Sequence, residues 1–203
     1  MLPVIAYHLI LTAYGFWLPN DPRGSWSEFV RAWELRRFGP ATKTNDHRSH
    51  AHDSHDVGRR LEAKLHLARN PVSFTGIQAR AVAQGFANFV QRSGITINAC
   101  AILPEHCHLV VLRHHYSIEE IARHLKADAT TQLKREVLHP FADEPYRDGS
   151  LPSPWARNEW SCFIDTDEYL RAAVDYVNRN PPREGLKPQR WTLVVPYDKR
   201  RAM

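Results

Sequence analysis

The chain has 203 residues, of which 43% are hydrophobic, with a formal net charge of +5 and a pI of about 9.3. This length predicts one domain over residues 1–203 with a single core and room for an inserted loop. No apolar run approaches the ~20 residues of a membrane helix, and the first residues lack the basic start of a signal peptide, so we expect a cytoplasmic protein. The basic excess suits a polyanionic partner but does not prove one.

The three cysteines are Cys100, Cys107 and Cys162, and no two of them form a CxxC pair. An odd number of widely spaced cysteines in a cytosolic protein is typical of buried thiols. We therefore expect neither a disulfide framework nor a zinc knuckle.

The N-terminal part begins with an expected strand and ends in a polar insertion. Residues 4–12 are rich in β-branched and aromatic side chains, which favours a strand. Residues 15–24 form a turn-rich loop, and the aromatic spacing over 25–40 is close to helical. Residues 41–60 are polar and break all periodicity, so we interpret them as a long exposed loop inserted into the domain.

Four histidines lie in this insertion: His47, His50, His52 and His55. They allow a metal-site interpretation, but a metal site requires ligands held on rigid elements, and nothing in this stretch predicts one. A solvated insertion is the interpretation that we favour, and we assign it no role.

The middle of the chain predicts a helix followed by two strands. Residues 75–92 have helical periodicity, and Gly94 marks the end of that helix. The expected apolar stripe is Ile77, Ala81, Val82, Gly85, Phe86, Phe89 and Val90. Residues 95–103 and 106–113 are typical of strands, and the short connection between them predicts antiparallel pairing. Helix, strand, turn and strand in this order indicate an α+β fold.

A second helix is expected from Ser117, where a capping-box pattern precedes it, to Pro140. Its expected buried stripe is Ile118, Ile121, Ala122, Leu125, Ala129 and Leu133, and Lys126 and Lys134 lie outside that stripe. Residues 155–164 predict a short strand. Residues 165–180 predict a last helix, which we expect Pro181 to end because a residue before proline avoids the helical region. Residues 191–195 are expected to be extended.

His106 and His108 stand two residues apart in the strand 106–113. Side chains at i and i+2 of a strand share a face, so these imidazoles project together while Cys107 and Leu109 point to the core. The pair predicts either a bidentate metal site or a polar patch. With 12 histidines in the chain such a spacing also arises by chance, and a metal site needs a third ligand.

Tyr176 and Asn180 lie on one face of the last expected helix, because residues four apart are neighbours on a helix surface. A phenol and a carboxamide there are able to reach the strand face that carries the two imidazoles. The ordinary alternatives are a packing tyrosine and an asparagine that caps the helix before proline.

The run "LPEHCHLVV" followed by "YVNRNPPREGL" resembles the HUH single-strand transposases, and in particular the REP-associated tyrosine transposases and their insertion-sequence relatives. The opening "AYHLILTAYGFWLPNDPRG" is similar to the first strand and loop of one branch, and "HLKADATTQL" is similar to its basic middle helix. The resemblance covers most of the chain. Cys107 departs from it, since a larger aliphatic residue is usual there, and so does the insertion.

The resemblance implies a ferredoxin-like HUH fold, in which helices pack on a central antiparallel β-sheet. It implies that His106, His108 and Asn180 bind a divalent ion, Mg²⁺ or Mn²⁺. Tyr176 would be the nucleophile that attacks a phosphodiester, leaving a 5′-phosphotyrosine and a free 3′-OH. The implied substrate is single-stranded DNA with a hairpin or palindromic end, cut and rejoined by a monomer or a homodimer.

Residue chemistry agrees with these roles. A phenol has a pKa of ~10, and a nearby cation favours the phenolate and polarises a phosphate. Lys126, Lys134 and Arg190 are candidate contacts to DNA phosphates. Trp155, Trp160 and Trp191 are candidates to stack on bases, although core packing is the ordinary role of tryptophan.

Two alternative functions stay open. A domesticated transposase without catalytic activity would bind nucleic acid for recognition or repression. A metal-dependent phosphoesterase for small substrates would hydrolyse them without a covalent intermediate.

Overall fold

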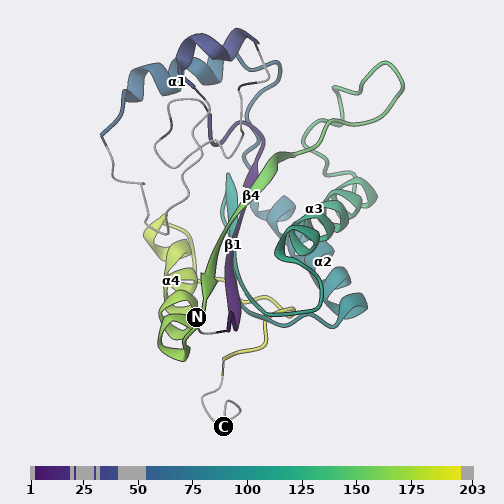
Figure 1. Ribbon diagram of the computed structural model, residues 1–203. Helices are drawn as coiled ribbons and strands as arrows, with labels where there is room; N and C mark the ends of the chain where they lie inside the picture. The colour runs from purple at the N-terminus through teal and green to yellow at the C-terminus, as the bar shows by residue number, and fades with distance from the viewer. Residues whose placement is uncertain (1–2, 19–20, 22–29, 31–32, 41–53, 198–203) are drawn as a thin grey trace.

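The computed structural model describes residues 3–18, 21, 30, 33–40 and 54–197 (Figure 1). In chain order the elements are β1 (Ala6–Ala13), the 3₁₀ helix η1 (Trp33–Phe38), α1 (Val57–Leu65), α2 (Gly76–Ser93), β2 (Ile97–Ile102), β3 (His106–Leu112), α3 (Ile118–Arg135), β4 (Trp155–Ile164) and α4 (Asp167–Arg183).

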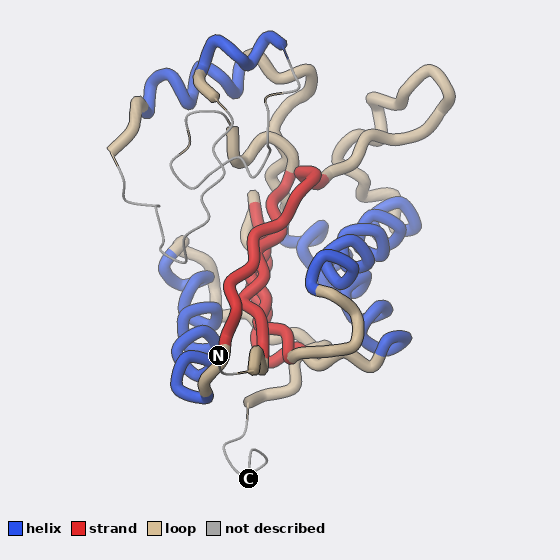
Figure 2. The backbone as a smooth tube through the Cα atoms, viewed as in Figure 1, coloured by secondary structure: helices blue, strands red, loops and turns tan. Residues whose placement is uncertain are grey.

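The four strands form one sheet in the order β2-β3-β1-β4, and every neighbouring pair is antiparallel. Without η1 and α1, the succession β1-α2-β2-β3-α3-β4 in this strand order is the ferredoxin-like arrangement. The expected α+β fold with a central antiparallel sheet is therefore confirmed. Helices α2 and α3 lie on one face of the sheet and α4 lies on the other (Figures 1 and 2).

The face under α2 and α3 holds the larger apolar core. The largest fully buried side chains include Phe86, Phe89, Leu109, Ile121 and Leu125. The two helices approach closely at Gly85, where an added Cβ would lie 2.5 Å from the Cα of Ala129.

Each of these helices starts at a capping box, since Thr75 and Gln78 exchange hydrogen bonds at the start of α2 and Ser117 and Glu120 do so at the start of α3. The expected stripe of α3 is buried as predicted, but Ile77 of α2 is 61% exposed and does not belong to the core.

The face under α4 holds a smaller apolar cluster. Its buried members are Ala6, Ala99, Ala101, Val110, Ile164, Leu170, Ala173 and Val177. Small side chains on the strands let α4 approach the sheet, and the remaining positions of this face are left for polar groups. The three cysteines are buried and free, as predicted.

Helix α4 is longer than its prolines suggest. We expected it to end at Asn180, but it continues through Pro181 and Pro182 to Arg183, so that prediction was wrong. The carbonyl of Asn180 still accepts a hydrogen bond from the Glu184 amide at 3.1 Å, which closes the last turn. The fixed φ of proline is compatible with a helix. Pro181 and Pro182 each lack one amide N–H, so the last turn of α4 loses only the hydrogen bonds that these two groups would donate.

The expected loop over 41–60 is also partly wrong. Residues 57–60 begin α1, which Asp56 caps by accepting a hydrogen bond from the Arg59 amide at 2.9 Å. This helix buries only Ala63, because its apolar residues Val57, Leu61 and Leu65, although spaced four apart, are all exposed. Residues 41–53, with three of the four insertion histidines, lie outside the described residues, and within 25–40 the described helical part is η1.

The stretch 191–195, which we expected to be extended, contains a turn in which the Val194 amide donates to the Trp191 carbonyl at 3.1 Å, and Val194 forms an isolated parallel bridge to Ile97. Among the described residues, no helix is long and apolar enough to cross a membrane.

Candidate active site

Strand β3 presents two imidazoles on the face that α4 covers. His106 lies opposite Thr12 of β1, and His108 lies opposite Ile10. Cys107 and Leu109 are buried in the core on the other face. The alternation expected from the spacing is confirmed, and the ring centroids of His106 and His108 are 4.8 Å apart.

Helix α4 brings the phenol of Tyr176 to these rings within a single chain. The centroid of Tyr176 lies 5.7 Å from that of His108 and 5.6 Å from that of His8, edge-on in both cases. Val177 next to it is fully buried, which fixes the rotation of the helix on the sheet. Tyr176 itself is 43% exposed, so the phenol touches the imidazoles and remains open to a large ligand.

Asn180 lies one turn after Tyr176 on the same helix and is only 7% exposed. Its amide nitrogen is buried and has no hydrogen-bond partner among the described residues. A buried amide without partners is destabilising unless a ligand or water completes it. This N–H donor therefore requires an acceptor, such as a phosphate oxygen or a water, on the face of α4 that carries Tyr176.

His8, which lies in the first predicted strand, is a site residue that was not included in the predicted set. Its Nε2 lies 3.0 Å from Nδ1 of His108, and the two rings stack with centroids 5.2 Å apart. The hydrogen bond orients the His108 ring and leaves its Nε2 available to a ligand, as outer partners of metal-binding histidines do. The pairing of β1 with β3 places His8 in the site, because positions 6, 8 and 10 of β1 lie on the same face of the sheet as His108.

Both histidines of this pair are held neutral. Desolvation lowers the pKa of His8 from 6.5 to about 4. Burial, and then the neighbouring rings of His106 and His8, hold the pKa of His108 well below its usual range. A neutral imidazole keeps the lone pair that binds a cation, so His108 is in its ligating form at neutral pH, and the neutral His8 adds no charge beside it.

Further side chains border the site. The ring of Phe16 stacks on His106 with centroids 4.7 Å apart, and Trp160 of β4 meets His8 edge-on at 5.9 Å. The guanidinium of Arg183, about two turns after Tyr176 on α4, lies 5.7 Å from the centre of the phenol ring. This cation is placed to attract an anionic phosphate toward Tyr176.

The donor set suits a weakly held cation. Within the described part of the chain, no group of three or more His, Cys, Asp or Glu side chains is arranged to hold a metal ion. Two imidazoles and the carboxamide of Asn180 are too few and too neutral for a structural zinc site. They fit an open site whose other positions are filled by water or phosphate oxygens.

Lys126 requires a correction among the predicted DNA contacts. It is 9% exposed, and its ammonium donates to the carbonyls of Ala156, Arg157 and Asn158 at 3.0–3.2 Å. Glu159 lies 3.5 Å from the same nitrogen. The charge thus holds the start of β4 against α3 and is not available to DNA.

The remaining predicted contacts lie apart from the rings around Tyr176. Lys134 is exposed in the last turn of α3, and Arg190 is exposed in the C-terminal segment. Trp155 is a core residue, 4% exposed, and Trp191 packs against the same core, so the ordinary role of tryptophan holds for both. Trp160 is the tryptophan that borders the site.

No family model matches the sequence, and no curated protein matches it. The solved structures that are similar to the chain include two transposases. One is a REP-associated tyrosine transposase bound to a REP hairpin, with 14% identity, a TM-score of 0.48, and coverage of 93% of this chain and 74% of that one. The other is a provisionally assigned transposase of Deinococcus radiodurans R1, with 13% identity, a TM-score of 0.37, and coverage of 89% and 92%. Scores this low carry no argument about function, which is argued below from the site.

Proposed function

We propose that this protein is a metal-dependent single-stranded DNA endonuclease and transesterase that acts as a transposase through a tyrosine nucleophile. The observation that carries the proposal is the meeting of Tyr176 with His108 and His8, at centroid distances of 5.7 and 5.6 Å. These residues come from the start, the middle and the C-terminal part of the chain, and the sequence resemblance assigns two of them, Tyr176 and His108, to one active site.

In the proposed reaction the oxygen of Tyr176 attacks the phosphorus of one phosphodiester. The bond from phosphorus to the 3′ oxygen breaks, that oxygen takes a proton, and the phosphate stays on the phenol as a 5′-phosphotyrosine. The phenolic proton leaves through the exposed side of the ring. The free 3′-OH of a DNA strand then reverses the step and rejoins the DNA, which a hydrolase cannot do.

His106, His108 and Asn180 are the proposed ligands of a divalent ion, Mg²⁺ or Mn²⁺. When bound, this ion supplies charge that polarises the scissile phosphate and favours the phenolate. His8 keeps the His108 ring in place through its hydrogen bond, and Arg183 attracts the phosphate to Tyr176. Lys134 and Arg190 are the proposed outer contacts to the DNA backbone.

The hairpin or palindromic end of the substrate is carried over from the sequence resemblance. The site itself supports a single strand more than a duplex, because the half-buried Trp160 borders the imidazoles with an aromatic ring on which an unpaired base stacks. All proposed catalytic and ligating residues lie on one chain, so a monomer is sufficient for cleavage.

The test compares Tyr176→Phe with Tyr169→Phe in an adduct assay on a hairpin oligonucleotide with Mn²⁺. Both tyrosines lie on α4 and are 43% exposed, so the second variant is a matched control. We expect Tyr176→Phe to bind the oligonucleotide normally and to form no covalent adduct, while Tyr169→Phe behaves as the wild type.

Other outcomes point to the alternatives. DNA binding without any adduct in the wild type indicates a protein that recognises DNA without cutting it. Cleaved product without a covalent intermediate indicates a hydrolytic phosphoesterase in which Tyr176 is idle.

A further inference from the structure

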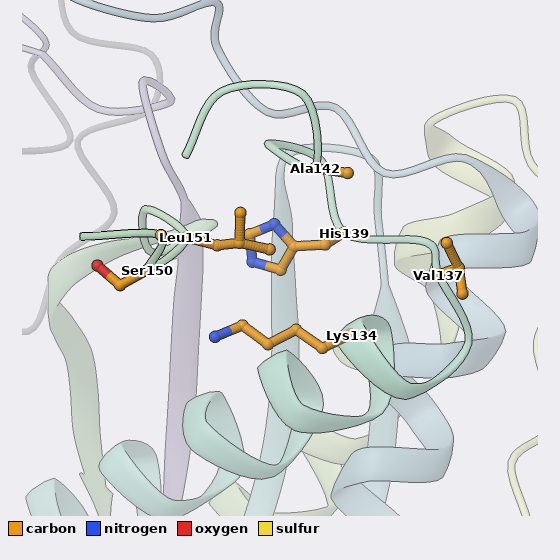
Figure 3. Close-up of a pocket in the computed structure, with 7 residues that line it drawn as sticks. Lys134, Val137, His139, Ala142, Ser150 and Leu151 are labelled. Atoms are coloured by element: carbon orange, nitrogen blue, oxygen red, sulfur yellow. The ribbon is translucent and has the colours of Figure 1, made fainter. Parts of the chain in front are cut away.

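A pocket of about 360 Å³ opens beside the C-terminal end of α3, against the loop that leads to β4 (Figure 3). The residues that line it are Lys134, Val137, His139, Ala142, Gly149, Ser150 and Leu151. None of them contributes to the proposed catalytic step. In Figure 3 the ring of His139 lies between the side chains of Leu151 and Lys134.

His139 offers one buried donor with nothing to bind. Its Nδ1 accepts a hydrogen bond from the Phe141 amide at 3.2 Å, so the proton of the neutral ring is on Nε2. His139 is 5% exposed, and its Nε2 has no hydrogen-bond partner among the described residues. Burial and the nearby charge of Lys134 lower the pKa of His139, which keeps the ring neutral. An N–H donor in this position requires an acceptor from outside the fold.

Val137 is strained at the rim of this pocket. The amides of Val137 and Leu138 donate to the carbonyls of Lys134 and Leu133, the pattern that ends a helix with a left-handed residue. Glycine is usual there, because a β-branched side chain resists positive φ, yet Val137 has φ 59°. Its side chain is also 84% exposed. Strain together with apolar exposure is typical of a residue that contacts a ligand.

Lys134 supplies the charge of the pocket. It is exposed and makes no hydrogen bond or salt bridge to any described residue, whereas the nearby Arg80 and Glu136 pair with each other at 2.6 Å. The pocket therefore combines a free cation, one N–H donor and apolar walls from Val137 and Leu151. A nucleotide has the matching groups: an anionic phosphate, base acceptors and an apolar ring face.

We propose that this pocket binds one nucleotide of the single-stranded DNA substrate, outside the cleavage site. Its phosphate contacts the ammonium of Lys134, an acceptor atom receives the Nε2 proton of His139, and the base lies against Val137. The inference rests on the proposed function, because it takes the ligand to be DNA.

The position of the pocket agrees with this role. The loop that lines it enters β4 at Trp155, which pairs with Ala13 of β1. The preceding residue of β1, Thr12, pairs with His106. The pocket and the imidazole pair thus lie toward the same end of the sheet, although α3 and α4 cover opposite faces, so a strand that occupies both passes around that end.

The first test measures the affinity for a fluorescent single-stranded oligonucleotide. Lys134→Gln is compared with Arg135→Gln, its exposed neighbour, which removes the same charge but does not line the pocket. We expect about tenfold weaker binding for Lys134→Gln and a change within about twofold for Arg135→Gln. Equal losses for the two variants would overturn the proposal, because general charge would then explain them.

The second test uses Val137→Gly and separates binding from folding. Glycine relieves the positive φ, so this variant unfolds at a higher urea concentration than the wild type, and we expect it to bind the oligonucleotide more weakly. Increased stability with unchanged affinity contradicts a contact between Val137 and DNA.

The third test uses His139→Asn, whose carboxamide oxygen replaces Nδ1 as acceptor for the Phe141 amide while the Nε2 donor is lost. We expect weaker binding with little change in stability, and unchanged affinity contradicts the proposal.

Failure of this inference is distinguishable from failure of the proposed function. If the wild type forms the Tyr176 adduct while all pocket variants bind like Arg135→Gln, only the pocket assignment fails. If the wild type neither binds nor cleaves the oligonucleotide, both fail.

Discussion

The two faces of the sheet differ in what they bury. Under α2 and α3 the face is apolar throughout, with side chains such as Phe86 and Leu125 fully buried. Under α4 an apolar cluster around Val177 covers part of the face, and His8 and His108 occupy the rest. Desolvated imidazoles destabilise a fold, so the first face has to supply the stability that the second gives up. The face under α2 and α3 thus supplies stability, and the face under α4 holds the residues of the proposed reaction.

The largest expected effect comes from a substitution in the apolar core under α2 and α3. Leu125→Ala leaves a cavity in the core under α3, and we expect it to lower the free energy of unfolding by about 3 kcal/mol, measured by urea denaturation. The residues around Tyr176 are untouched, so adduct formation per folded molecule stays at the wild-type level. A loss of adduct in protein that is still folded contradicts the separation of the two faces.

Val177→Ala is the corresponding substitution in the apolar cluster under α4. Val177 is fully buried against the sheet and adjoins Tyr176, so we expect a smaller loss of stability, about 1–2 kcal/mol, together with slower adduct formation because α4 loses its fixed rotation. The two variants should therefore rank in opposite orders for stability and for adduct rate. The same rank in both measurements argues against the account.

The affinity for Mn²⁺ should also differ between variants on the two faces of the sheet. We expect His108→Gln to weaken Mn²⁺ binding at least about tenfold, measured by titration without DNA, because it removes a proposed ligand. His124→Gln is the matched control, because His124 lies on α3, which covers the opposite face of the sheet. This variant should bind Mn²⁺ as the wild type does. Equal Mn²⁺ affinity in both variants removes His108 from the ligand set.

The smallest expected effect concerns pH and His139. Burial, with the charge of Lys134, lowers its pKa from the ordinary 6.5, so the unfolded chain takes up a proton at a higher pH than the folded protein. The free energy of unfolding therefore falls as the pH drops below 6.5. His139→Asn should make this dependence shallower than in the wild type, measured by urea denaturation between pH 7 and the folded pKa. An unchanged slope means that His139 does not titrate as described.

The sequence predicted what depends on local pattern. The alternation of β3 put His106 and His108 on one face, the apolar period placed α2, the capping box at Ser117 placed the start of α3, and the residues of β4 were assigned correctly. In each case one element carries the whole signal, so its period or its cap is sufficient.

The sequence failed where the outcome depends on contacts between distant elements. His8 joins the site only because β1 pairs with β3, and Lys126 is buried only because the carbonyls at the start of β4 meet α3. Helix α1 begins inside the polar stretch assigned to a loop, and its apolar residues Val57, Leu61 and Leu65 are exposed. We expected α4 to end at Asn180 because proline follows, but the helix continues through Pro181 and Pro182 to Arg183.

The most direct test of the central claim is the mass of the covalent product. Wild-type protein with Mn²⁺ and a hairpin oligonucleotide is digested, and the peptide that carries the 5′-phosphate of the cleaved DNA is sequenced. The account predicts that the modified residue is Tyr176 and that Tyr176→Phe yields no modified peptide. A DNA-linked peptide from Tyr176→Phe, or one modified at any other residue of the wild type, contradicts it.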